Sequence, residues 1–212
     1  MKGATIRGWA LALGLGCMVG CDDGGGGSGL SNGNPGNNDL NVVVAFGDSL
    51  TQGNMCDCPP YPSRLAGLIG KSVVNTGVAG TMAVENVERT QAAIDRFHPA
   101  FMLILYGVND VIHGYGPSAI AGALTEMVQI CKDNHVVPVL ATYPETILDH
   151  AGFAPRVLQL NSRIRSLAGE LNVHCVDLEK EFGANPDLYE IDGLHPNDAG
   201  TQIMALAFAD LF

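Results

Sequence analysis

The sequence predicts an α/β fold, a three-layer α/β/α sandwich in which helices cover both faces of a parallel five-stranded sheet. Three observations predict it. Five short apolar runs have the composition of strands buried on both faces. Segments with apolar residues at three- and four-residue steps lie between these runs. The two patterns alternate along the chain, and strands that alternate with helices are joined by right-handed crossovers into a parallel sheet.

The predicted strands are runs rich in Val, Ile and Leu. They cover Asn41–Phe46, Ser72–Asn75, Phe101–Tyr106, Val136–Thr142 and Val173–Asp177. In parallel sheets of this kind the functional groups gather in the loops beyond the carboxyl ends of the strands. We therefore expect the informative residues directly after these five runs.

The predicted helices separate the strands and close the chain. They cover Ser63–Ile69, Ala83–Phe97, Ser118–Asn134, Pro155–Leu171 and about Asp198–Leu211. The pattern is clearest in the fourth, where Val157, Leu160 and Ile164 share a face and arginines interleave. No internal repeat interrupts the alternation.

Length and composition limit the classes of protein. The 212 residues allow one ordinary domain with a short appendage, and 47% hydrophobic residues allow a sizeable core. The net charge of −11 argues against nucleic acid as the partner, because phosphate contacts need clustered cations. The same charge disfavours docking on anionic lipid through a basic patch.

The first 20 residues are predicted to be a signal peptide. Lys2 and Arg7 form a cationic start, and Trp9 to Val19 is apolar or small, too short for a comfortable membrane-spanning helix. Cys21 follows Met18-Val-Gly20, which resembles the bacterial lipobox, so we expect Cys21 to be lipidated. The alternative is a plain secretory signal in which the cysteine is incidental.

Residues 21–39 are predicted to be a flexible tether between the lipidated cysteine and the domain at 40–212. The segment is almost entirely Gly, Asn, Asp and Ser, which cannot build a core. We therefore expect an exported lipoprotein facing the periplasm or the cell surface. Its membrane contact would be the lipid alone, since the mature chain is strongly acidic.

Four polar motifs follow predicted strands or precede the last helix. They are Gly47-Asp-Ser-Leu-Thr51, Asn75-Thr-Gly-Val-Ala-Gly80, Gly107-Val-Asn-Asp110 and Asp192-Gly-Leu-His-Pro196. Each alone is weak, because a Ser after a strand is usually a cap and a Gly usually a turn. Together they place a Ser, a Gly, an Asn and an Asp-x-x-His at one edge of one sheet.

These motifs resemble, in order, the sequence blocks of the SGNH hydrolases, also called the GDSL esterase/lipase family. The resemblance extends from about Asn41 to the C-terminus. Ser49 matches the first block, Gly80 the second, Asn109 the third, and Asp192 with His195 the last. It implies a flavodoxin-like sandwich and an esterase. It also implies an oxyanion hole formed by the backbone N–H groups of Ser49 and Gly80 and the Asn109 amide.

The residue types also suit ester hydrolysis without the name. A serine attacks an acyl carbon only when a general base takes its proton, and His195 suits that task. Asp192, three residues earlier, could hold the imidazole in one tautomer, which completes a triad of Ser49, Asp192 and His195. The motif around Ser49 is not Gly-x-Ser-x-Gly, so the strained turn of α/β-hydrolases is not expected.

Other reactive side chains receive plainer interpretations. Asp48 and Asp110 flank site residues and are interpreted as acceptors of backbone N–H groups. The remaining histidines show no i, i+4 pairing and no Cys-x-x-Cys companion, so neither a metal nor a cofactor is expected. Cys56 and Cys58 could form a tight bridge, whereas Cys131 and Cys175 are equally plausible as buried thiols.

The predicted activity is hydrolysis of carboxylic esters through an acyl-enzyme at Ser49. The compact body without a lid insertion favours small acyl groups, such as acetyl esters of a small molecule or a glycan. A lysophospholipase or thioesterase for longer chains is the competing enzyme. A carbohydrate-binding protein without the chemistry and an acyltransferase are further alternatives, and the oligomeric state stays open.

Overall fold

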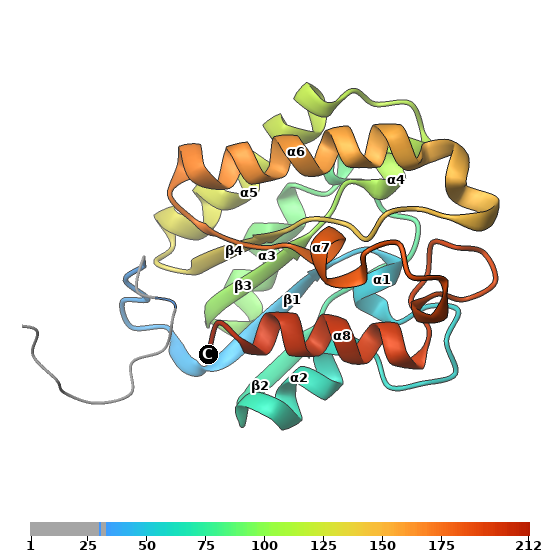
Figure 1. Cartoon of the computed structure of the whole chain (residues 1–212). Coiled ribbons are helices and arrows are strands. Elements are labelled where there is room, and N and C mark those ends of the chain that lie inside the picture. Colours follow the sequence, from blue (N-terminus) through green and yellow to red (C-terminus); the bar gives the residue numbers. More distant parts are fainter. Residues whose placement is uncertain (1–29, 31–32) are drawn as a thin grey trace, which may run out of the picture.

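The computed structural model describes residues 30 and 33–212, which fold around one parallel sheet (Figure 1). Its strands are β1 (Asp39–Gly47), β2 (Ser72–Asn75), β3 (Pro99–Leu105), β4 (Val137–Ala141) and β5 (His174–Val176). Their order is β2-β1-β3-β4-β5, and every pairing is parallel. The predicted five-stranded sheet and its flavodoxin-like order are therefore confirmed.

Five longer helices form the two outer layers. They are α2 (Tyr61–Ile69), α3 (Glu88–Phe97), α5 (Pro117–Asp133), α6 (Ala154–Leu171) and α8 (Asp198–Ala209). In Figure 1, α2 and α8 lie side by side on one face of the sheet, and α5 and α6 lie together on the other. α3 packs against α5. The predicted three layers are present.

Six shorter elements were not predicted. They are α1 (Ser49–Gln52), α4 (Val108–Ile112), α7 (Leu178–Phe182) and the 3-10 turns η1 (Ala83–Glu85), η2 (Leu148–Phe153) and η3 (Pro186–Leu188). The prediction of one helix over Ala83–Phe97 was wrong in its first third. Asp110 accepts the backbone N–H groups of Ala83 and Val84, so this stretch forms a separate turn before α3.

The core lies on both faces of the two central strands. All seven residues of β3 are buried, as is β1 from Val43 onward. Strands that are buried on both faces hold their carboxyl ends in fixed positions, because every side chain along them is packed. The loops that follow β1 and β3 therefore start from a rigid platform.

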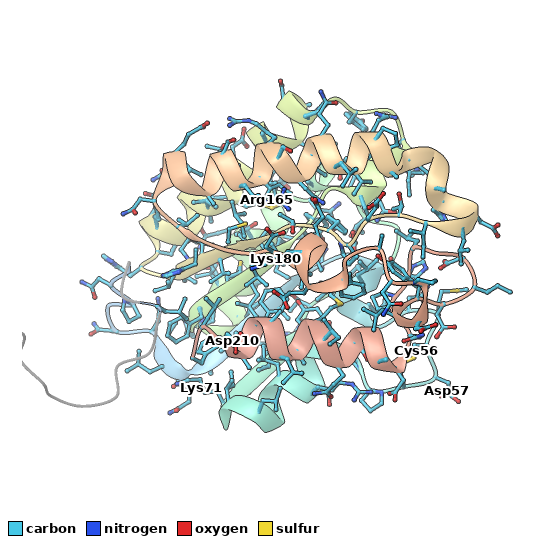
Figure 2. The ribbon with its side chains drawn as sticks, viewed as in Figure 1. Cys56, Asp57, Lys71, Arg165, Lys180 and Asp210 are labelled. Carbon is cyan, nitrogen blue, oxygen red and sulfur yellow. A yellow bond between two sulfur atoms is a disulfide. The ribbon has the colours of Figure 1, made fainter. Side chains whose placement is uncertain are left out.

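α6 is joined to the segment after β5 by charged contacts. Figure 2 labels Arg165 on α6 and Lys180 on α7. Arg165 donates to Asp177 at 2.7 Å and to Glu179 at 2.9 Å. The hydrogen bond from Arg165 lowers the pKa of Asp177 more strongly than partial burial raises it. These contacts hold the segment after the edge strand β5 against α6.

The folded part of the chain begins earlier than predicted. Leu30 is buried, and the Asn38 side-chain amide donates to the carbonyls of Asn134 and His135, both at 2.9 Å. β1 itself starts at Asp39, so the predicted boundary at 39/40 was too late. The predicted signal peptide, residues 1–20, and the lipidation residue Cys21 lie outside the described residues.

The described helices include none that is both long enough and apolar enough to cross a membrane.

Candidate active site

Ser49, His195 and Asp192 form one hydrogen-bonded chain at the carboxyl edge of the sheet. Ser49 Oγ lies 3.0 Å from His195 Nε2, although 146 residues separate them in sequence. His195 Nδ1 lies 2.6 Å from Asp192 Oδ2. Acceptance by a carboxylate leaves the proton on Nδ1, so Nε2 is free to take the serine proton. The arrangement has the geometry of a nucleophile, a base and an orienting carboxylate.

The serine is placed by the end of β1. The strand stops at Gly47, and Asp48 caps the short helix α1 by accepting the N–H of Leu50 at 3.0 Å. Ser49 is the first residue of α1 and is only 5% exposed. The helix cap at Asp48 directly follows the end of β1, and it thus places the Ser49 hydroxyl at the edge of the core.

The turn from Asp192 to His195 is held by its own carboxylate. Asp192 Oδ1 accepts the N–H groups of Leu194 and His195, both at 3.0 Å. Burial raises the pKa of Asp192, but the hydrogen bonds from the His195 ring and from the two backbone N–H groups outweigh it and lower the pKa below its usual range. His150 Nδ1 also donates to the Asp192 carbonyl at 2.8 Å.

Gly193 lets this turn lie against the loop after β4. Its φ is +69°, and its carbonyl accepts the N–H of Ile147 at 2.9 Å. A Cβ on Gly193 would stand 2.1 Å from the Ile147 carbonyl oxygen. Only glycine fits both the conformation and the contact. The sequence showed a Gly between Asp192 and His195 but not this neighbour.

The predicted oxyanion donors lie in the three segments that follow β1, β2 and β3: Ser49 begins α1, Asn109 is in α4, and Gly80 is in the loop after β2. The structure records no acceptor for the backbone N–H groups of Ser49 and Gly80 within the described part of the chain. Asn109 is 9% exposed, and its Nδ2 donates to the Thr81 carbonyl at 3.0 Å. Gly80 has a φ of +75°, and a Cβ there would meet no atom within 4 Å. Glycine is favoured at position 80 by the positive φ and not by crowding, because a Cβ there would not clash with any neighbouring atom.

A bracket of three side chains supports the loop that carries Gly80. Arg89 donates from Nη2 to the Thr76 carbonyl at 2.8 Å and from Nη1 to the Tyr106 hydroxyl at 2.5 Å. The Tyr106 hydroxyl lies 3.1 Å from Thr81 Oγ1. The loop is thereby tied to α3 through Arg89 and to Tyr106, the residue directly after β3. Sequence reasoning did not find this bracket, because its members share no motif.

Asp48 and Asp110 act as the acceptors that the sequence predicted. Asp48 is fully buried and accepts from Leu50 N and from the Tyr143 hydroxyl, the latter at 2.6 Å. Asp110, also fully buried, holds the start of η1. Burial raises the pKa of Asp48 to about 7, although the hydrogen bonds from Tyr143 and Leu50 oppose the rise.

The loop after α1 contains a disulfide between Cys56 and Cys58. Figure 2 labels Cys56 and Asp57 there. This loop, Glu190 and residues 197–199 line a cavity of about 720 Å³ beside the triad; neither Ser49 nor His195 lines it. Cys131 and Cys175 carry free thiols, and burial raises their pKa values to about 12 and about 11.

Within the described ranges, no three His, Cys, Asp or Glu side chains stand close enough together to hold a metal ion.

A parallel α/β sandwich with a Ser–His–Asp chain at its carboxyl edge is the arrangement of a serine hydrolase. The residues around Ser49, Gly47-Asp-Ser-Leu-Thr51, do not form the Gly-x-Ser-x-Gly turn, so the chain falls in the class of serine hydrolases without it. The model of the GDSL-like lipase/acylhydrolase family matches residues 45–203. The chain belongs to this family and is a carboxylic ester hydrolase.

Relatives and solved structures agree with this assignment. Over 161 residues the chain is 27% identical to thioesterase 1/protease 1/lysophospholipase L1 of Escherichia coli K12, covering 74% of this chain and 76% of that protein. Over 98 residues it is 26% identical to an arylesterase of Vibrio mimicus, covering 43% and 49%. A catalytic mutant of an acetylxylan esterase from Geobacillus stearothermophilus superposes with a TM-score of 0.71 at 20% identity, covering 81% and 93%.

Proposed function

We propose that Ser49 is the nucleophile of an esterase that works through an acyl-enzyme. The hydrogen-bonded chain from Ser49 through His195 to Asp192, at 3.0 and 2.6 Å, carries the proposal. Ser49 Oγ attacks the acyl carbon while its proton passes to His195 Nε2. Asp192 stabilises the imidazolium that forms.

The second half of the reaction uses the same groups. The ester C–O bond breaks, and His195 returns its proton to the departing alcohol. Water then attacks the acyl carbon and gives a proton to His195, and the acid leaves as the Ser49 hydroxyl is restored. The N–H groups of Ser49, Gly80 and Asn109 would stabilise both oxyanions, each worth about a hundred- to a thousandfold in turnover.

The proposed substrates are short-chain esters, in particular acetyl esters of a small molecule or a carbohydrate. No large insertion interrupts the described sandwich between β1 and α8, and the nearby cavity is not lined by Ser49 or His195. A site that no large insertion covers suits a small acyl group on a large alcohol. The fold shared with an acetylxylan esterase is compatible with this proposal.

A longer acyl chain is the second candidate, because apolar side chains stand exposed beside the triad. Ile191, next to Asp192, is 87% exposed, and Leu148 in the neighbouring turn is 54% exposed. The Escherichia coli relative is named a thioesterase and lysophospholipase. An alkyl chain lying across these side chains would bury apolar surface.

One experiment separates the two candidates. The protein is assayed with p-nitrophenyl esters of two to sixteen acyl carbons, and kcat/KM is measured for each with Ser49→Ala as control. An optimum at the acetyl or butyryl ester supports the short-chain proposal, and an optimum above eight carbons supports the second candidate. A wild type that is inert on every ester would move the binding or acyl-transfer alternatives to the front.

We also propose that the protein is exported and anchored through a lipid on Cys21. The cationic start, the apolar stretch and the lipobox-like Met18-Val-Gly20 before Cys21 support this. The membrane fraction should contain a chain that begins at a lipid-modified Cys21, and Cys21→Ser should release the esterase into the soluble fraction. Recovery of the Ser variant in the membrane would contradict the proposal.

A further inference from the structure

The Asn109 amide faces two acceptors inside the protein. One N–H donates to the Thr81 carbonyl at 3.0 Å. The same nitrogen lies 3.4 Å from Asp48 Oδ2, beyond the usual length of an N–H···O bond. An amide nitrogen carries only two N–H groups. If Asp48 took the second one fully, none would remain for the oxyanion.

Asp48 Oδ2 already has a closer donor. The hydroxyl of Tyr143, the second residue beyond the end of β4, donates to Oδ2 at 2.6 Å across 95 positions of sequence. Both side chains are fully buried. Asp48 Oδ1 is occupied separately by the Leu50 N–H. Tyr143 thus meets the hydrogen-bonding demand of the one carboxylate oxygen that competes for Asn109.

We propose that Tyr143 is a positioning residue of the esterase: by satisfying Asp48 Oδ2 it leaves the second N–H of Asn109 free to bind the oxyanion. The inference rests on the proposed function of Asn109. It assigns a role to a tyrosine outside the four motifs that identify the family.

Removal of the Tyr143 hydroxyl should redirect the Asn109 amide. A buried carboxylate oxygen that loses its donor is strongly destabilised unless it takes up a proton or another donor approaches. At an assay pH above the pKa of Asp48, which is about 7 in the wild type, the approach of another donor is the expected response. The remaining side-chain donor recorded at Oδ2 is Asn109 Nδ2. The amide would shift towards Asp48, and the oxyanion would lose part of its third donor.

The experiment compares kcat and KM on p-nitrophenyl acetate for the wild type, Tyr143→Phe, Asn109→Ala and the double variant. Rates are expressed per active site titrated with a fluorophosphonate, so that unfolded protein does not count. Tyr143→Phe should lower kcat by about ten- to a hundredfold, up to the loss of one oxyanion donor, and leave KM within about twofold. In the Asn109→Ala background it should change kcat by less than about twofold.

Tyr61→Phe is the matched control. Tyr61 is equally buried and stacks on Phe208, and its hydroxyl has only a 3.5 Å contact with Thr51. Its kcat should stay that of the wild type. A fall in kcat equal to that of Tyr143→Phe would mean that any buried tyrosine hydroxyl matters, and would overturn the specific role of Tyr143.

A rescue variant covers the case in which Tyr143→Phe does not fold. In Asp48→Asn the side chain carries no charge, so it no longer competes strongly for the Asn109 amide. Asp48→Asn and Asp48→Asn/Tyr143→Phe should therefore have the same kcat within about twofold. A tenfold or larger difference between them contradicts the proposal.

The failures of the two proposals are distinguishable. If Asn109→Ala leaves kcat unchanged, the oxyanion role in the proposed function fails. If Asn109→Ala lowers kcat but Tyr143→Phe does not, only the role of Tyr143 fails. The same holds if Tyr143→Phe lowers kcat by the same factor in the wild type and in the Asn109→Ala variant.

Discussion

Asp48 and Asp192 are two carboxyl groups of one site whose pKa values are shifted in opposite directions. Burial raises that of Asp48 to about 7, whereas hydrogen bonds from His195 and from two backbone N–H groups outweigh burial and lower that of Asp192. Environments that separate two carboxyl groups in this way give them different tasks. Asp192 stays ionised beside the imidazole, whereas Asp48 accepts hydrogen bonds from Leu50 and Tyr143 in the protein interior.

Asp192→Asn tests the orienting carboxylate. The amide can still accept the Leu194 and His195 N–H groups through one oxygen, so the turn should survive. Without a carboxylate at 2.6 Å the imidazole loses its tautomer preference, and kcat should fall by about ten-thousandfold. Steady-state kinetics on p-nitrophenyl acetate, with circular dichroism to confirm the fold, would check this. A loss below tenfold would contradict the role of Asp192.

The pH dependence of stability tests the burial of Asp48. The unfolded chain releases this proton near the ordinary pKa of 3.8, and the folded chain near 7. Between these values the folded state holds the extra proton, so the Asp48 contribution to stability falls as pH rises and is constant above about 7.

The measurement is urea unfolding of the wild type and of Asp48→Asn across that range. The wild-type free energy of unfolding should fall relative to that of the variant by at most about 4 kcal/mol, at about 1.4 kcal/mol per pKa unit. Asp192, shifted downward, acts in the opposite sense and at lower pH, and it is present in both proteins. Parallel pH curves for the two proteins would show that Asp48 is not shifted.

Gly80→Ala tests whether the positive φ of Gly80 is needed to place its N–H in the predicted oxyanion hole. A Cβ at φ +75° costs about 1–2 kcal/mol although it meets no atom within 4 Å. The loop should relax to a negative φ and move its N–H, so kcat should fall about a hundredfold. Gly70, with a φ of +66° and equally open space at the end of α2, is the matched control. Gly70→Ala should lose similar stability and keep its kcat; equal kcat values for the two variants would count against the oxyanion role.

Much of the fold could be predicted because its signals are local. The five strands are short apolar runs, and the residues that follow them carry Ser49, Gly80 and Asn109 within a few positions. Parallel strands bring such positions to one edge whatever the loop lengths. The same logic, extended to the end of β4, would have drawn attention to Tyr143.

The remainder depends on contacts between distant residues. The sequence around Gly193 does not predict its contact with the Ile147 carbonyl. In the same way, the sequence around Asp48 does not predict its hydrogen bond from the Tyr143 hydroxyl. The break before α3 is made by Asp110, which lies beyond β3. The early start of the folded chain rests on the contacts of Asn38 with the end of α5, which composition alone hides.

The most direct test of the central claim is to locate the nucleophile. The wild type is treated with a fluorophosphonate, which phosphonylates an activated serine with loss of fluoride, and the modified peptide is identified by mass spectrometry. We predict a single adduct on Ser49, with at least a hundredfold slower labelling in His195→Ala, because the proton acceptor 3.0 Å from Ser49 Oγ is then missing. No adduct, or an adduct on another residue, would contradict the account.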